Sequence, residues 1–359
     1  MKKSVEGVTA RRLLHYGLQG AVLALLVTFG VLAFTMAPET LQGLRDMHVR
    51  YVLPMVALVL GAWGCLAGRI WIAARALKHP VPYRGALRIA ISTEFGVAAS
   101  PAGVGGTAIR LALLRSAGVP LGIGTTMVGA DVLLDVLFFI LVTPFALWVL
   151  LADPSWSGLL HTLFTSARCL PLLLIVAPVF IALALLVRRG SWFRDAQWLA
   201  RKAPGSIRYR LPARVRLARS RVRSGVHQAT GSAAYLYRQE WPALIGMFGL
   251  ACLQWCCRYG VLPLLLLSLS THRNPFPLLV LQGILFGISF LLVVPGGGGV
   301  IEMLSVMVLP LFVPRALIGM ALLIWRFFTY YVHLLIGGAV FLNTIHNLGR
   351  LRNGPASSP

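Results

Sequence analysis

Long apolar segments constrain the fold of this sequence more than any other feature. A transmembrane helix needs roughly 20 consecutive, mostly apolar residues. Segments that reach or approach this length are residues 18–34, 51–72, 121–151, 170–187, 241–269, 278–294 and 318–342. Charged residues make up only 12% of the chain, whereas a soluble domain carries about 25%. The sequence therefore predicts an all-α integral membrane protein.

The charges between the apolar segments predict the orientation. The 33 Lys and Arg residues against 10 Asp and Glu give a formal charge of +23. These positive charges cluster between apolar segments, which favours a role in membrane topology over nucleic-acid binding. By the positive-inside rule, we expect a multi-pass membrane protein with both termini in the cytoplasm. The segments expected on the cytoplasmic side include residues 75–88, the basic loop 188–240 and the tail 346–359.

Two segments are interrupted by Pro and Gly, and each flanking half is too short to span a membrane comfortably. We interpret residues 83–117 and 276–313 as re-entrant helical hairpins, added to about six full spans. Such backbone is tolerated at membrane depth only when it is buried in protein or lines a cavity. One hairpin falls in the membrane half 1–187 and the other in the half 241–345, the pattern of an inverted-repeat transporter. The expected break residues are Pro101, Gly105, Gly106, Pro295, Gly296, Gly297 and Gly299.

Four of the ten acidic residues lie within apolar stretches: Glu94, Asp131, Asp135 and Glu302. An acid in the membrane interior costs at least about 2.5 kcal/mol on insertion scales, so it is a functional candidate. Asp131 and Asp135 are four residues apart, so a helix places them on one face. The alternative interpretation is a set of buried ion pairs with Arg110, Arg115, Arg258 or Arg326.

Arg110 and Arg326 are candidates for binding a phosphate, since a guanidinium can donate two parallel hydrogen bonds to it. Arg110 lies four residues after Gly106, so we expect it in the first turn after the break. The helix dipole disfavours a cation there. An anion should therefore compensate it: a carboxylate, with Asp135 or Glu302 favoured, or a lipid phosphate.

Other kinds of site are not predicted. The eight His residues form no pair at metal-ligand spacing. The five Cys residues lie in or beside apolar segments and are interpreted as small apolar core residues. Neither a metal nor a cofactor is therefore expected. The glycine run that follows Pro295 lacks the Gly-Lys-Ser/Thr ending of a phosphate loop. Residues 206–224 carry seven Arg residues. They could lie on anionic lipid head groups or form a solvated loop that only fixes topology.

These motifs resemble a known family. The stretch 91–119, the acids after it and the sequence PGGGGVIEML at 295–304 resemble the flippase-like membrane region of bacterial lysylphosphatidylglycerol synthases and its stand-alone relatives. The resemblance covers roughly residues 10 to 345 and assigns family positions to Pro101, Gly105, Gly106, Arg110, Asp135, Pro295, Gly296, Gly297, Gly299, Glu302, Arg326 and Tyr330. The chain departs from the family at residues 129–130, where an acid is common, and ends without the aminoacyl-transfer domain of full-length members.

The leading hypothesis is a lipid translocase rather than an enzyme. It would move an anionic phospholipid or a polyprenyl-linked lipid between the leaflets of the bacterial inner membrane. Arg110 and Arg326 would hold the phosphate, and Glu94, Asp135, Glu302 and Tyr330 would complete the substrate site. The alternatives are a membrane enzyme acting on a lipid phosphate or glycolipid, and a scaffold for a separate lipid-modifying enzyme.

Overall fold

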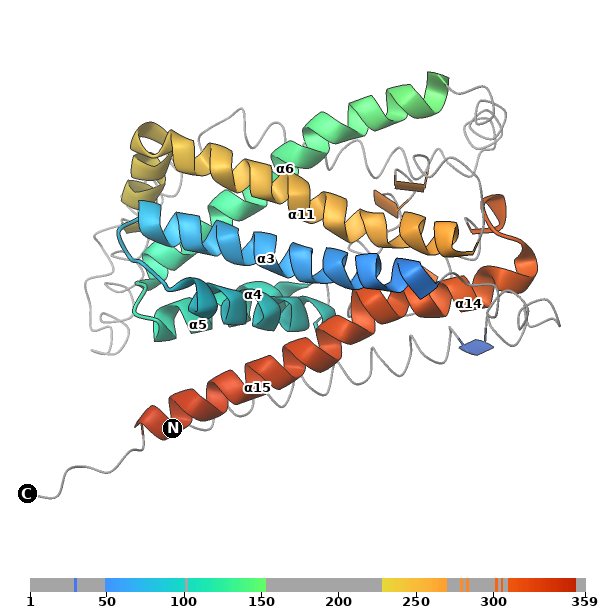
Figure 1. Cartoon of the computed structure of the whole chain (residues 1–359). Helices are drawn as coiled ribbons and strands as arrows, with labels where there is room; N and C mark the ends of the chain where they lie inside the picture. Colours follow the sequence, from blue (N-terminus) through green and yellow to red (C-terminus); the bar gives the residue numbers. More distant parts are fainter. Residues whose placement is uncertain are drawn as a thin grey trace, which may run out of the picture.

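The structure is a computed structural model, and it describes residues 29–30, 49–100, 103–152, 228–269, 278–279, 282–283, 301–302, 305 and 309–352. All regular structure in these residues is helical. Four stretches are long and apolar enough to cross a membrane: Val52–Ala76, Leu121–Phe145, Trp241–Ser268 and Arg315–Leu348. The predicted all-α membrane class is therefore confirmed (Figure 1).

The long helices begin and end close to the boundaries predicted from the apolar segments. They are α3 (Val52–Ala76), α6 (Leu121–Ala152), α11 (Trp241–Ser268) and α14 (Arg315–Arg326), which continues through the π-helical turn η3 (Phe327–Tyr331) into α15 (Val332–Arg352). Short 3-10 turns lie at η1 (Val49–Tyr51) and η2 (Leu309–Leu311). Most of the predicted spans 18–34 and 278–294, all of 170–187 and the break residues Pro295, Gly296, Gly297 and Gly299 lie outside the described residues. The total of six spans stays a prediction.

Helices α3 and α11 pack side by side in antiparallel directions (Figure 1). A Cβ added at Gly68 would lie 2.8 Å from Leu250, one at Gly61 would lie 3.2 Å from Cys257 Sγ, and one at Gly260 would lie 3.1 Å from Leu58. As the residue numbers rise along α3, the numbers of the α11 residues that they contact fall, so the two helices run antiparallel. Small residues permit such close approach between helices in a membrane, where lipid supplies no hydrophobic drive for association.

Residues 83–116 form two short helices joined by a sharp turn. Helix α4 covers Tyr83–Ala98 and α5 covers Val104–Ser116, so at 1.5 Å per residue they are only about 24 and 20 Å long. The chain reverses at Gly103, whose φ of 69° is left-handed and favours glycine. A break of this kind was predicted for the segment, although Pro101 itself lies outside the described residues.

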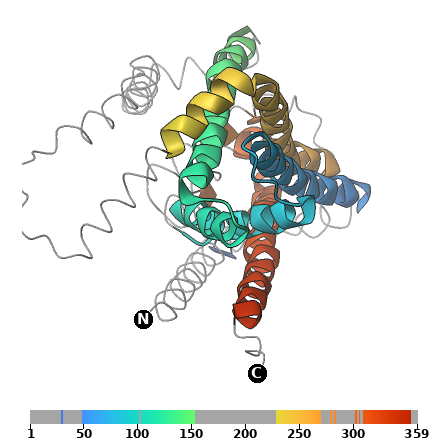
Figure 2. The same ribbon diagram turned by 90° about the vertical axis from the view of Figure 1, so that its left-hand side faces the viewer.

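Gly105 and Gly106 have a different role from the one predicted, because they lie in the first turn of α5 rather than in the break. A Cβ on Gly105 would lie 2.7 Å from the Gly96 carbonyl oxygen, and one on Gly106 would lie 2.4 Å from Val97 Cγ2. The two glycines thus let α5 pack directly on the backbone of α4. Behind this hairpin, α15 covers α4 at Gly337, where an added Cβ would meet Phe95 at 2.9 Å (Figure 2).

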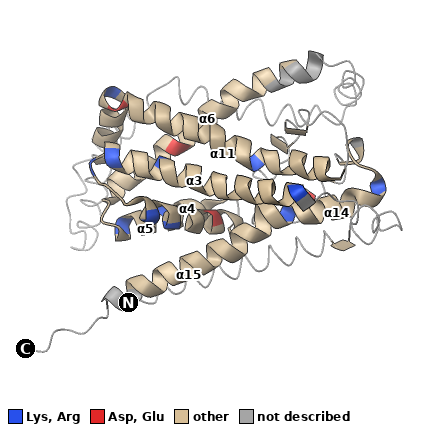
Figure 3. Cartoon of the chain, in the orientation of Figure 1, with Lys and Arg blue, Asp and Glu red and all other residues tan. Residues whose placement is uncertain are grey.

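Many Lys and Arg residues lie at the end of the bundle where α3 ends and α4 begins, which is the side predicted to be cytoplasmic (Figure 3). Helix α3 ends with the His79 N–H donating to the Ala74 carbonyl at 2.9 Å and the Lys78 N–H donating to Arg75 at 3.0 Å, the hydrogen bonds of a Schellman motif. Glycine is usual at the left-handed position of this motif. Here the residue is Lys78, with a φ of 59°, at a backbone cost of about 1 to 2 kcal/mol.

The basic loop predicted for residues 188–240 is described only at its end. Residues 228–239 are helical and lead into α11. The arginine-rich stretch 206–224 lies outside the described residues.

Candidate substrate site

Several polar side chains meet in a cavity of about 170 Å³ between the long helices and the α4–α5 hairpin. The walls come from α3, α4, α5, α6 and α11. Its charged lining residues are Arg69, Arg110, Arg258, Glu94, Asp131 and Asp135. The cavity thus combines three arginines with three carboxylates inside helices that are otherwise apolar, and Figure 3 shows the acids as isolated red segments within the helices.

Arg69 on α3 is the centre of this site. Its Nε donates to Asp131 Oδ1 at 3.1 Å, and its Nη1 donates to Asp135 Oδ1 and to Gln254 Oε1, both at 2.9 Å. Its Nη2 donates to the backbone carbonyl of Asp131 at 2.9 Å. The Trp255 indole N–H donates to Asp135 Oδ1 at 3.1 Å. One guanidinium therefore ties α3 to both α6 and α11, with each of its nitrogens engaged.

Arg110 on α5 pairs with Asp131, through Nη2 and Oδ2. This corrects the expectation that Asp135 or Glu302 would be the favoured partner. Asp135 is held by Arg69 and Trp255, and Glu302 is held by Arg326. The helical position is also corrected: α5 begins at Val104, so Arg110 lies in the second turn rather than the first.

Glu94 on α4 pairs with Arg258 of α11 through Oε1 and Nη2. Its other oxygen lies 4.0 Å from Nε2 of His333 on α15, and the His333 ring packs against Trp63 with centroids 5.6 Å apart. The Glu94 side chain is only 3% exposed, whereas that of Arg258 is 27% exposed. Arg258 is thus the cavity arginine most open to an entering group.

The remaining predicted site residues lie together in a second cluster. Arg326 Nε donates to Glu302 Oε1 at 2.5 Å, and both side chains are at most 1% exposed. The Arg326 guanidinium lies 4.5 Å from the centre of the Tyr330 ring, where α14 passes into the π-helical turn. None of the three lines the cavity described above. The structure therefore brings Glu94, Asp135 and Arg110 together, and Arg326, Glu302 and Tyr330 separately.

Sequence reasoning missed Arg69, Gln254 and Trp255. Arg69 and Trp255 donate hydrogen bonds to Asp135, and Gln254 accepts one from Arg69. Arg69 carried a usable signal: it is a lone arginine near the end of an apolar segment, where an ionisable residue marks a site. Gln254 and Trp255 carried none, because polar and aromatic residues occur within many spanning helices. Among the described residues, three of the four intramembrane acids pair with arginines named in the ion-pair alternative: Asp131 with Arg110, Glu94 with Arg258 and Glu302 with Arg326. Asp135 pairs instead with Arg69, which that alternative did not include.

Apolar spanning helices around a buried cavity of paired charges define a polytopic membrane protein with a polar site inside its helical bundle. The chain matches the family described as "Lysylphosphatidylglycerol synthase TM region" over residues 21–337, and it belongs to that family. It is also similar to a protein described as "UPF0104 membrane protein" from Archaeoglobus fulgidus, at 20% identity over 318 residues, or 89% of this chain and 94% of that protein. The family resemblance seen in the motifs is thereby confirmed, and it links the chain to membrane lipid metabolism.

Proposed function

We propose that this protein is a lipid translocase that carries the phosphate-bearing head group of an anionic phospholipid or polyprenyl-linked lipid across the inner membrane. The observation that supports this most directly is the buried cavity with Arg69, Arg110 and Arg258 in its wall. A cavity of about 170 Å³ is smaller than the roughly 300 to 1,000 Å³ of pockets that enclose a drug-sized ligand. It suits a head-group fragment whose acyl chains stay in the bilayer.

Two of the arginines have donor capacity to spare. Among the described residues, the Nε atoms of Arg110 and Arg258 are buried and have no hydrogen-bond partner. A buried donor without a partner costs about 1 to 3 kcal/mol, which a phosphate oxygen would offset. Arginine is suited to this role because its planar fork can donate two hydrogen bonds to one phosphate.

The cavity charges give the transport step a proton requirement. With all six groups ionised, the three arginines balance the three carboxylates. Adding a phosphodiester leaves one negative charge uncompensated in a medium of low dielectric constant, where a lone charge is strongly disfavoured. A proton taken up by Glu94 or Asp135 as the lipid enters restores neutrality. It also releases an arginine from its carboxylate, so in this mechanism these acids carry protons rather than perform covalent catalysis.

The α4–α5 hairpin would be re-entrant in this mechanism. Its helices are about 24 and 20 Å long, against a hydrocarbon core of about 30 Å. Glu94 and Arg110 face the cavity from the two arms of the hairpin.

Labelling of single cysteines introduced at residues 205–225 in a cysteine-free background tests the orientation of the protein in the membrane. Reaction only from the cytoplasmic side supports it, and reaction from outside intact cells contradicts it.

The experiment that tests the function is translocation by the purified protein in liposomes. Fluorescent lipids with phosphatidylglycerol, phosphatidylethanolamine, phosphatidylcholine and polyprenyl-phosphate head groups are supplied in one leaflet, and their loss to the other is followed by dithionite quenching. We expect transport of at least one phosphate-bearing lipid, faster with a proton gradient. No transport of any head group by folded protein would overturn the proposal.

A further inference from the structure

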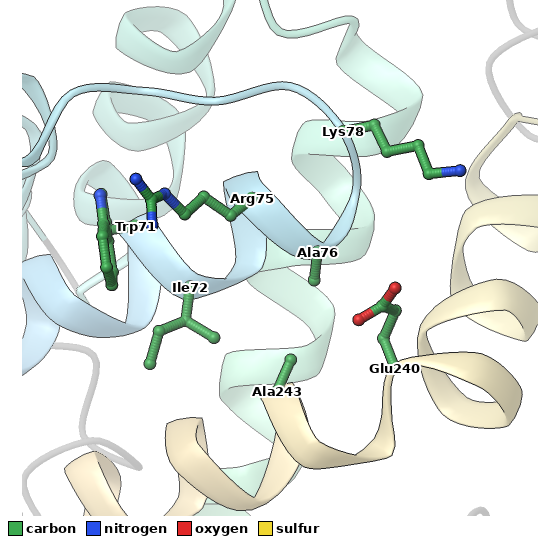
Figure 4. Close-up of a pocket in the computed structure, with 7 residues that line it drawn as sticks. All are labelled: Trp71, Ile72, Arg75, Ala76, Lys78, Glu240 and Ala243. Carbon is green, nitrogen blue, oxygen red and sulfur yellow. The ribbon is translucent and has the colours of Figure 1, made fainter.

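A second pocket lies where α3 ends and α11 begins, away from the cavity inside the bundle. It has a volume of about 380 Å³ and is lined by Trp71, Ile72, Arg75, Ala76, Lys78, Glu240 and Ala243. Figure 4 shows the Lys78 and Glu240 side chains on one side of the pocket and the Arg75 guanidinium on the other side, beside Trp71. The pocket lies at the ends of two helices that are long and apolar enough to span a membrane, so helices that do span it would place the pocket at the level of the lipid head groups.

The cations of this pocket are held by aromatic rings and not by acids. The Arg75 guanidinium lies 4.1 Å from the centre of the Trp71 ring, and the Lys78 ammonium lies 5.3 Å from the centre of the Tyr235 ring. Within the described part of the chain, neither residue forms an ion pair. A ring face orients a cation without neutralising it, so both charges stay available to an anion.

The carboxylate of the pocket is positioned in a comparable way. The Tyr235 hydroxyl donates to Glu240 Oε1 at 3.0 Å, which leaves Oε2 free to accept a further hydrogen bond. Glu240 is the residue just before α11. Like the two cations, it makes no ion pair within the described residues. The pocket therefore presents two cations and one anion, each with spare hydrogen-bonding capacity.

The backbone at Lys78 is a second, independent indication that this side chain is used. Lys78 occupies the left-handed position that closes α3, with a φ of 59°, where glycine would fit without strain. Strained positions of this kind concentrate at functional sites. A lysine whose only role was to add charge near the helix end could stand at a neighbouring, unstrained position.

We propose that this pocket binds a phosphoethanolamine group, with the phosphodiester accepting a hydrogen bond from Lys78 and the primary ammonium donating to Glu240, since both side chains lie beside Tyr235. The position at head-group level points to an aminophospholipid of the inner leaflet. The site is distinct from the translocation cavity and does not depend on the proposed transport. A phosphatidylglycerol head group lacks the ammonium, and the trimethylated ammonium of phosphatidylcholine has no N–H to donate.

Native mass spectrometry of the purified full chain, titrated with phosphatidylethanolamine, phosphatidylglycerol or phosphatidylcholine, tests this assignment. We expect phosphatidylethanolamine to bind about tenfold more tightly than the other two, since one charge-assisted hydrogen bond has roughly that value. Lys78→Gly should weaken its binding about tenfold while thermal stability stays equal or rises, because glycine relieves the backbone strain. Glu240→Gln should remove the preference for phosphatidylethanolamine over phosphatidylglycerol.

Arg84→Ala is the matched control, since it removes an exposed positive charge on the same side of the protein but outside the pocket. It should bind as the native chain does. Soluble phosphoethanolamine, added as a competitor, distinguishes a site for a lipid from a site for the free head group. If the site binds a lipid, the soluble compound should compete only weakly, because tight binding also requires the acyl chains. Unchanged binding by Lys78→Gly, or an equal loss in Arg84→Ala, would overturn the proposal.

Discussion

The two buried arginine–carboxylate clusters of this protein differ in their access to other groups. Arg326 and Glu302 enclose each other, with side chains at most 1% exposed. Around the cavity, the charges are shared unevenly: Asp131 takes both Arg69 and Arg110, Asp135 is 30% exposed, and Arg258 is 27% exposed. A closed pair serves packing and helix register, whereas a cluster beside a cavity can exchange a protein partner for a ligand. Burial of charge alone therefore does not identify a substrate site.

The largest stability loss should follow from breaking the closed pair. Arg326→Ala removes the arginine that pairs with the buried Glu302 carboxylate, and breaking a buried ion pair by removing one partner costs about 3 to 5 kcal/mol. Thermal unfolding in detergent should show a greatly lowered midpoint or no folded protein. The double variant Arg326→Met with Glu302→Leu should recover most of the stability, because it replaces both charges with apolar side chains of similar volume. If the double variant is folded but cannot transport lipid, the pair belongs to the substrate site after all.

Arg69→Ala should lower the free energy of unfolding by a smaller amount, about 2 to 4 kcal/mol. Arg69 joins α3 to α6 and α11 through Asp131, Asp135 and Gln254, but Arg110 would still neutralise Asp131. Arg69→Lys should retain part of the stability, since an ammonium keeps the charge but loses the planar fork. The same unfolding assay measures both variants. An Arg69→Ala protein as stable as the native chain would contradict its role as the tie between the three helices.

The sequence predicted the helical scaffold well because the scaffold follows from local properties. Apolar length located α3, α6 and α11 within a few residues, and the Pro/Gly cluster located the reversal between α4 and α5. The pairing of charges could not be predicted from one sequence, because it depends on how the helices rotate against one another. Asp131 rather than Asp135 pairs with Arg110 because two acids on one helix face compete for several arginines, and only packing decides the outcome.

Disturbing the close packing between α4 and α5 should lower the stability of the protein moderately. In Gly96→Ala the new Cβ would lie 2.7 Å from the Gly105 carbonyl oxygen, so α4 and α5 must separate, at about 1 to 3 kcal/mol. Gly129→Ala in α6 is the control, because a Cβ there meets nothing within 4 Å. Its helix should be unchanged or stabilised by up to about 1 kcal/mol. We expect Gly96→Ala to impair transport more than stability, since the hairpin carries Glu94 and Arg110; equal behaviour of the two variants would argue against this.

The smallest stability effect is expected at Asp135, the most exposed of the cavity acids. Asp135→Asn keeps a side-chain oxygen for the Arg69 and Trp255 hydrogen bonds, and Arg69 retains Asp131. The unfolding midpoint should therefore shift by the equivalent of about 1 kcal/mol or less. If Asp135 carries a proton during transport, this variant should lose its response to a proton gradient. Transport by Asp135→Asn that keeps the native response would assign the proton to another group.

The central claim is that Arg110 serves a lipid phosphate as well as Asp131, and its most direct test is transport by folded Arg110 variants. In liposomes, Arg110→Ala should abolish translocation of the native lipid while circular dichroism and elution volume remain native. Arg110→Lys should restore little activity, because it cannot donate two parallel hydrogen bonds to one phosphate. Full transport by Arg110→Ala, or loss of the folded protein in both Arg110→Ala and Arg110→Lys, would contradict the account and leave Arg110–Asp131 as a structural ion pair.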